Sequence, residues 1–123
     1  ENMIKDESYT AETHGTAVTG IIAAQKNAVG IIGLAPQTQI LALRACRQLQ
    51  SESADAECYS SSLAKAMDRA NIEQVQITNL SFGTPSTDPL ISYLLNHAHE
   101  QGMLLVASAG NDRIQQQFSF LQL

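Results

Sequence analysis

The stretch Leu104-Leu105-Val106-Ala107-Ser108-Ala109-Gly110-Asn111 decides the fold that we expect for this chain of 123 residues. Four apolar residues lead into small residues, a glycine and an amide side chain, a pattern that predicts a buried strand ending in a sharp turn. Asn111 is therefore expected at the carboxyl end of a strand, where open α/β sheets place their ligand crevices. Its side-chain NH2 group donates hydrogen bonds without carrying charge, which suits the stabilisation of an oxyanion. The alternative is a turn asparagine in the left-handed conformation.

Helical and strand-like patterns alternate along the rest of the chain, which predicts an α/β fold with a parallel sheet and helices on both faces. We expect helices over 14–25, over 60–70, and from Asp88-Pro89 to a stop at Gly102, with strands over 39–44, 75–82 and 104–107. The first helix is expected to be buried, because its apolar residues recur at helical spacing. His97 and His99 lie off the apolar stripe of the last helix and are expected at the surface.

A second informative stretch is His14-Gly15-Thr16-Ala17-Val18-Thr19-Gly20-Ile21-Ile22, which places an imidazole at the start of the first predicted helix. An ordinary histidine pKa of about 6.5 allows the ring to take and return a proton near neutral pH. Taken alone, a histidine before an apolar run is more often a residue at the end of a buried helix. The interpretation of His14 as a general base therefore depends on the other segments.

Four blocks of sequence resemble the subtilisin-like serine proteases, or subtilases, and occur in the order typical of that family. They are His14-Gly15-Thr16 with Val18 and Gly20, then Val29-Gly30-Ile31-Ile32-Gly33-Leu34-Ala35-Pro36, Ile77-Thr78-Asn79-Leu80-Ser81-Phe82-Gly83, and Ala107 to Asn111. The resemblance covers residues 14 to about 112, and residues 113–123 form a divergent tail. Ala17 stands where the family often has histidine, and Thr19 where it often has alanine. The resemblance implies a single, partial subtilase catalytic domain over residues 1–123, with an incomplete subtilisin-like sheet.

The resemblance also assigns roles to residues. It implies that His14 is the general base and acid of a serine endopeptidase and that Asn111 belongs to its oxyanion hole. It implies that the substrate is a peptide or protein in extended conformation, lying in a roomy, apolar cleft. The cleft residues would be Ser81, Phe82, Gly83, Ser108, Ala109 and Gly110.

The aspartate and serine of the Asp-His-Ser triad have no counterpart in this sequence. Asp6 is the sole aspartate before His14 and is not part of an Asp-Ser-Gly or Asp-Thr-Gly turn, and no Gly-Thr-Ser-Met-Ala sequence follows Asn111. We therefore expect the 123-residue chain alone to be inactive. Two readings stay open: part of an active endopeptidase whose aspartate and serine are encoded elsewhere, or a non-catalytic, degenerate homologue that binds peptides.

Composition and cysteine usage limit the remaining possibilities. The net charge is −5 and the seven basic residues are scattered, which excludes a nucleic-acid surface. No apolar run is long enough for a membrane span, and the first residues lack a signal-peptide pattern. Cys46 and Cys58 flank a polar segment, and they either form a disulfide with each other or remain two unlinked thiols. The disulfide is favoured because subtilases are mostly exported, which also implies a secreted or periplasmic location. No histidine lies near the two cysteines, so zinc is not expected.

A calcium loop is the one metal site that the resemblance suggests. Residues 25–31 resemble a family loop that binds Ca²⁺ through backbone carbonyls and one side-chain oxygen, here that of Asn27. Calcium takes six to eight oxygens, and this loop contains no carboxylate. We expect catalysis to need no cofactor, with a structural calcium only in a full-length parent.

Overall fold

The computed structural model describes residues 1–5, 12–49, 56–83 and 88–108. The chain divides into two compact units, Glu1–Tyr59 and Ser60–Leu123, and each is considered by itself. No helix in the described ranges is both long and apolar enough to cross a membrane.

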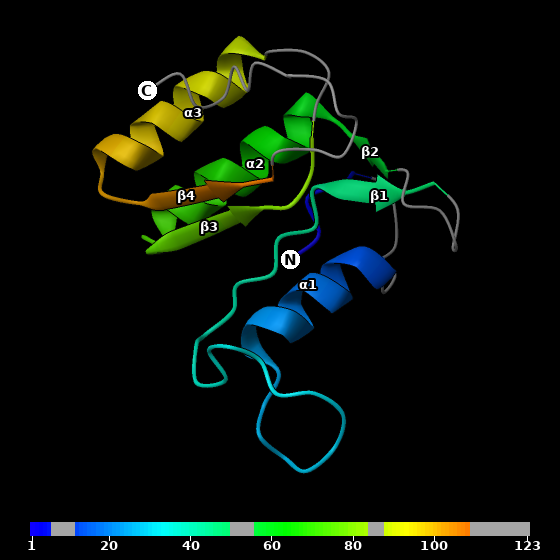
Figure 1. Ribbon diagram of the computed structural model, residues 1–123. Helices are drawn as coiled ribbons and strands as arrows, with labels where there is room; N and C mark the ends of the chain where they lie inside the picture. Colours follow the sequence, from blue (N-terminus) through cyan, green and yellow to red (C-terminus); the bar gives the residue numbers. More distant parts are fainter. Residues whose placement is uncertain (6–11, 50–55, 84–87, 109–123) are drawn as a thin grey trace. The chain divides into compact units, whose positions relative to one another are not determined.

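The second unit is built on a two-stranded parallel sheet (Figure 1). Strands β3 (Ile77–Leu80) and β4 (Leu104–Ala107) pair in register from Ile77 opposite Leu104 to Leu80 opposite Ala107. Helix α3 (Pro89–Glu100) connects them, which gives the strand–helix–strand crossover that parallel pairing requires. The expected α/β class with a parallel sheet is confirmed.

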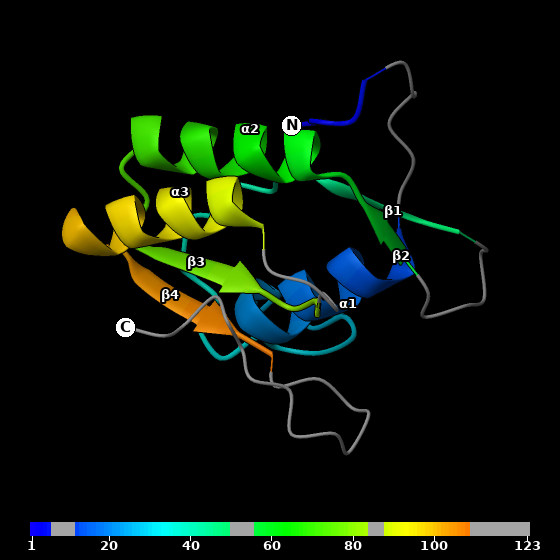
Figure 2. The same ribbon diagram turned by 90° about the horizontal axis from the view of Figure 1, so that it is seen from above.

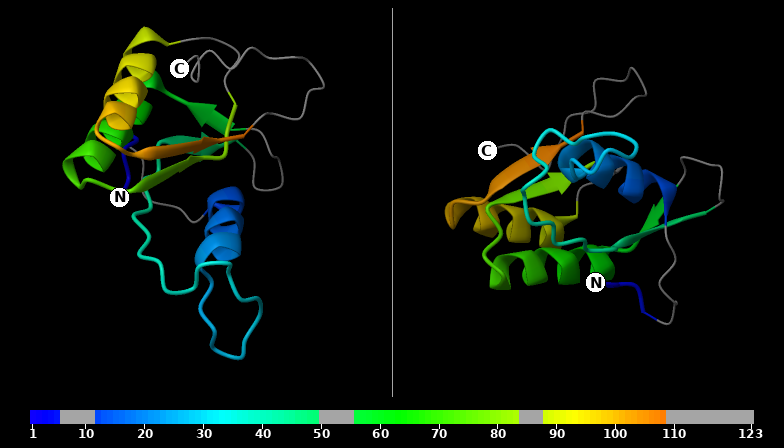
Figure 3. Two further views of the ribbon diagram at one scale, coloured as in Figure 1. Left: turned by 60° about the vertical axis from the view of Figure 1, so that its left-hand side comes forward. Right: turned by 90° about the horizontal axis from the view of Figure 1, so that it is seen from below.

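Helices α2 (Ser60–Ile72) and α3 lie side by side on the same face of this sheet (Figures 2 and 3). Within this unit the two helices therefore cover one face of the sheet. The strands alternate accordingly, since Thr78, Leu80, Leu105 and Ala107 are half-buried. On the opposite face Ile77, Leu104 and Val106 are 61%, 57% and 45% exposed.

The core of the second unit lies between the two helices. Its buried apolar residues are Ala66, Met67 and Ala70 from α2, Ile91, Leu95 and Ala98 from α3, and Met103 just before β4. The alanines allow close approach of the helices, and burial of a side chain such as Leu95 contributes about 1.5–3 kcal/mol. In α2 the apolar side chain of Leu63 is only half-buried, whereas Ser62 is buried.

The ends of α3 follow the local signals in its sequence. The Asp88 carboxylate accepts hydrogen bonds from the backbone N–H groups of Leu90 (2.9 Å) and Ile91 (3.3 Å), and Pro89 occupies the first turn. Hydrogen bonds from the Ser60 side chain and from those two backbone groups hold the pKa of Asp88 below its ordinary value. At the other end Gly102 adopts a φ of 89°, which glycine tolerates without strain.

The first unit contains helix α1 (Thr13–Ala23) and an antiparallel hairpin of β1 (Cys46–Gln48) and β2 (Ala56–Cys58). Two sequence predictions for this unit are wrong. The strand expected over 39–44 is absent, because a strand needs a partner and only Arg44 is paired in the described part of this segment, in an isolated bridge to Asn2. Helix α1 lies where expected, but the prediction that it is buried is wrong, because none of its residues is buried. Helical periodicity identifies an apolar face but does not show whether other residues pack against it.

Candidate active site

The predicted general base, His14, lies in the first turn of α1. Its helix begins after Glu12, whose extended backbone (φ −113°, ψ 137°) marks the N-cap. The Glu12 carbonyl accepts from the Thr16 N–H (3.2 Å) and the Thr16 hydroxyl (2.7 Å), so this turn is closed locally. His14 itself is exposed, as a base that exchanges protons with a substrate or nucleophile must be.

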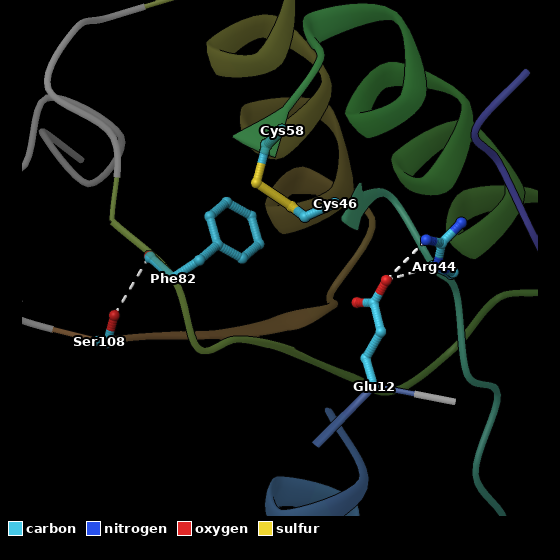
Figure 4. The surroundings of a disulfide bond; sticks show 6 residues. All are labelled: Glu12, Arg44, Cys46, Cys58, Phe82 and Ser108. Carbon is cyan, nitrogen blue, oxygen red and sulfur yellow. Dashed lines mark hydrogen bonds and ion pairs between the residues drawn. A yellow bond between two sulfur atoms is a disulfide. The ribbon is translucent and has the colours of Figure 1, made fainter. Parts of the chain in front are cut away.

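An ion pair holds the residue from which α1 starts (Figure 4). The Arg44 guanidinium donates from Nε (2.8 Å) and Nη2 (2.6 Å) to Oε1 of Glu12, and both side chains are mostly buried. Arg44 Nη1 also donates to the side-chain oxygen of Asn2 at 3.2 Å. The sequence does not predict this pair, because 32 residues separate its members and neither belongs to a recognisable motif.

The C-terminal end of α1 is held by the segment Gly33-Leu34-Ala35. Its three N–H groups donate to the carbonyls of Ala24, Ile21 and Ile22 respectively, at 2.8–3.0 Å. These carbonyls lie in the last turn of the helix and just beyond it, where intrahelical partners run out. The approach requires glycine, because a Cβ on Gly33 would lie 2.5–2.7 Å from three backbone atoms. The block 29–36 is one of the four that resemble the subtilases, but the resemblance does not predict the close contact of Gly33 with the backbone of α1.

The predicted cleft residues meet at the carboxyl end of the parallel sheet. The Ser108 N–H donates to the Leu80 carbonyl (3.2 Å), and the Ser108 hydroxyl donates to the Phe82 carbonyl (3.1 Å; Figure 4). Ser81 accepts a hydrogen bond from the Asn79 side chain at 2.8 Å. Nothing lies within 4 Å of a Cβ built on Gly83, so the backbone there is open to a ligand.

Ala109, Gly110 and Asn111 fall outside the described residues. His14 belongs to the unit Glu1–Tyr59, whereas Ser81–Gly83 and Ser108 belong to Ser60–Leu123. The structure therefore brings together the two strand ends of the cleft, whereas His14 lies on helix α1 of the other unit.

A disulfide between Cys46 and Cys58 joins β1 to β2, with the two Cα atoms 4.2 Å apart. Beside it, Arg47 Nε (2.9 Å) and Nη2 (2.6 Å) donate to Glu57 Oε2, and the Tyr59 hydroxyl donates to the same oxygen (3.0 Å). The hydrogen bond from Arg47, and to a smaller extent the one from Tyr59, holds the pKa of Glu57 below its ordinary value. The disulfide and the Arg47–Glu57 ion pair therefore join the two strands, although neither strand contains a β-branched or aromatic residue.

Comparison with known proteins decides the family. The sequence model of the subtilase family (peptidase S8) matches residues 1–121. This chain belongs to the subtilase family.

Several curated subtilases align with this chain. The minor extracellular protease Epr of Bacillus subtilis is 42% identical over 99 residues, which are 80% of this chain and 14% of that protein. Subtilisin BL of Lederbergia lenta is 35% identical over 98 residues, 80% of this chain and 34% of that protein. Subtilisin DY of Bacillus licheniformis is 29% identical over 112 residues, 89% of this chain and 39% of that protein. The chain thus spans less than half the length of each of these relatives.

The calcium candidate of this subtilase chain lies in an exposed loop after α1. The side-chain oxygen of Asn27 accepts from the Val29 N–H at 3.1 Å, which makes a local turn, and Ala28 adopts a φ of 65°. Within the described part of the chain no group of three or more histidine, cysteine, aspartate or glutamate side chains is placed to hold a metal. Calcium takes six to eight oxygen ligands, and the one side-chain oxygen of Asn27 in this loop accepts the hydrogen bond of the turn.

Proposed function

We propose that this chain carries the general base and one side of the substrate cleft of a subtilisin-like serine endopeptidase. The observation that carries the proposal is the meeting of Ser81–Gly83 and Ser108 at the carboxyl edge of a parallel sheet in a subtilase chain. Crevices for ligands in open α/β sheets lie at that edge. The triad aspartate and serine would be supplied by sequence outside these residues.

In this mechanism His14 accepts the proton of the serine hydroxyl as its oxygen attacks the peptide carbonyl. The C–N bond then breaks as His14 returns that proton to the leaving amine. Asn111 would donate a hydrogen bond to the oxyanion of the tetrahedral intermediate, an interaction worth about 10²–10³ in turnover. Exposure of His14 in the first turn of α1 supports this role, because the ring is accessible to both partners.

The substrate would bind as an added strand. Backbone groups of the two strand ends would pair with an extended peptide, and the open backbone at Gly83 leaves space for it. Half-buried Phe82 would contact substrate side chains in a roomy, apolar pocket. A profile of cleaved peptides with a strict preference for acidic residues would contradict this assignment.

The location of the protein follows from the same proposal. A disulfide closes the hairpin, and disulfides persist in oxidising compartments. One relative is by name an extracellular protease. We propose that the protein is secreted or periplasmic.

The test uses the protein encoded by the complete coding sequence around this chain. We expect it to hydrolyse peptides and to react with a serine-directed fluorophosphonate probe, and we expect His14→Ala to lose hydrolysis while keeping its fold. Peptide binding without hydrolysis or labelling would instead favour the alternative, a non-catalytic peptide-binding module. Near-normal turnover by the His14→Ala variant would remove His14 from the mechanism.

A further inference from the structure

Helix α1 makes defined contacts at both of its ends. None of its eleven residues is buried, so it has no buried side chain to fix it against its own unit. Its C-terminal end is hydrogen-bonded to Gly33-Leu34-Ala35. At its N-terminal end the Glu12 side chain makes no capping bond, and the first turn is closed only by the bonds from Thr16 to the Glu12 carbonyl among the backbone and capping contacts described above.

The Glu12–Arg44 ion pair links this end of α1 to a distant part of the same unit (Figure 4). Two guanidinium nitrogens reach one carboxylate oxygen at 2.6 and 2.8 Å, and the exposed fractions of the Arg44 and Glu12 side chains are 10% and 22%. Charge-assisted bonds of this length are stronger than neutral ones, and low exposure limits their screening by water and salt.

Arg44 is itself fixed on its other side. Its backbone carbonyl accepts from the Met3 N–H (2.9 Å), its N–H donates to the Glu1 carbonyl (2.8 Å), and Nη1 reaches Asn2. The backbone of Arg44 is therefore held by hydrogen bonds to residues 1–3, and its guanidinium can in turn hold the carboxylate of Glu12.

We propose that Arg44 is a positioning residue for His14. Arg44 fixes Glu12, the N-cap from which α1 starts, and thereby fixes the first turn and the direction of the His14 ring. The inference rests on the proposed role of His14 as general base. A shift of a catalytic group by about 1 Å can cost about 10²-fold in rate, so loss of this anchor is expected to lower turnover.

The experiment compares variants of the complete protein. We expect Arg44→Gln and Glu12→Gln each to lower kcat about 10- to 100-fold with KM within about twofold, because the loss lies in the placement of the base. The double variant should be no slower than the slower single variant, since both act through one contact. Arg44→Lys should recover part of the loss, because it keeps the charge but not the fork of donors.

Two controls separate positioning from general damage. Arg69→Gln breaks the Arg69–Glu73 pair on α2, which has the same 2.6 Å contact, and should leave kcat within about twofold. Hydrogen exchange of the α1 amides in the 123-residue chain should become faster in Arg44→Gln and Glu12→Gln and stay unchanged in Arg69→Gln. Circular dichroism identifies any variant that fails to fold. If Arg44→Gln fails to fold, the kcat of Glu12→Gln decides the question, because glutamine has nearly the same shape as glutamate.

Each outcome is decisive. Lower kcat together with faster α1 exchange supports the proposal. Wild-type kcat in both Arg44→Gln and Glu12→Gln, or a loss of kcat with unchanged α1 exchange, overturns it. A wild-type protein that neither hydrolyses peptides nor reacts with the fluorophosphonate overturns the proposed function and the role of Arg44 with it. Exchange in the 123-residue chain then still reports whether Arg44 holds the helix.

Discussion

Replacement of Gly33 by alanine should destabilise the first unit strongly. The new Cβ would lie 2.5 Å from Ala24 N, 2.6 Å from Ala23 N and 2.7 Å from Ile22 O. Real Cβ atoms essentially never come within 3.0 Å of such atoms, so the segment must retreat by at least the 0.5 Å difference between 3.0 and 2.5 Å. Because all three neighbours are backbone atoms, no side chain can rotate away.

The expected cost follows from two effects of that retreat. Overpacking of this kind costs about 1–3 kcal/mol. The hydrogen bonds from residues 33–35 to α1, now 2.8–3.0 Å, would lengthen toward the limit of bonding, and each is worth about 1 kcal/mol. We therefore expect Gly33→Ala to lower the free energy of unfolding by about 2–4 kcal/mol.

Urea unfolding followed by circular dichroism measures this change, with Gly20→Ala as the matched control. A Cβ on Gly20 would meet only Ile31 Cδ1, at 3.8 Å, an ordinary contact. Alanine is favoured over glycine inside a helix by about 0.5–1 kcal/mol, so Gly20→Ala should be neutral or stabilising. Equal stability of Gly33→Ala and the wild type, or a greater loss for Gly20→Ala, would refute the reasoning.

Four further predictions concern the disulfide, the base, the isolated chain and a helix cap. The double variant Cys46→Ser/Cys58→Ser should lose about 3 kcal/mol by the loop-entropy estimate for a separation of 12 residues, measured by urea unfolding; an unchanged midpoint would contradict it. In the complete protein His14→Ala should lose about 10⁴–10⁶-fold in kcat, the range known for triad residues of subtilisin itself, with an unchanged circular dichroism spectrum. The 123-residue chain alone should cleave no member of a mixed peptide library, and inhibitable cleavage with labelling of any serine would disprove this. The lowered pKa of Asp88 means that its carboxylate stabilises the fold above the ordinary pKa of 3.8 and that this contribution disappears as the pH falls through the lowered value. Asp88→Asn keeps a capping oxygen, so its melting temperature should fall less between pH 5 and pH 2 than that of the wild type; parallel curves would count against the assignment.

The second unit was largely predictable because its signals are local. Asp88-Pro89 and Gly102 delimit α3 through capping and backbone preference, which depend on a few neighbouring residues. The segments that become β3 and β4 are each followed by a serine, and their parallel pairing follows from the helix between them. The strand ends that form the candidate cleft could be placed for the same reason.

The first unit was less predictable because distant contacts determine it. The run 40–43 has strand-forming residues but forms no strand, whereas β1 and β2 form from polar residues joined by a disulfide and an ion pair. The anchors of α1 were missed for a related reason. The sequence does not reveal that Arg44 meets Glu12, or that Gly33 lies against the helix backbone.

The uncovered face of the β3–β4 sheet has a practical consequence for the production of this chain. In the described part of the chain, Ile77, Leu104 and Val106 present a patch of branched aliphatic side chains to solvent on a two-stranded sheet. Such a patch favours self-association during expression and concentration, all the more because parallel strands leave unpaired backbone groups at both edges. Polar replacements at Leu104 and Val106 would improve the yield of monomer for spectroscopy, since these side chains point away from the helices that form the core.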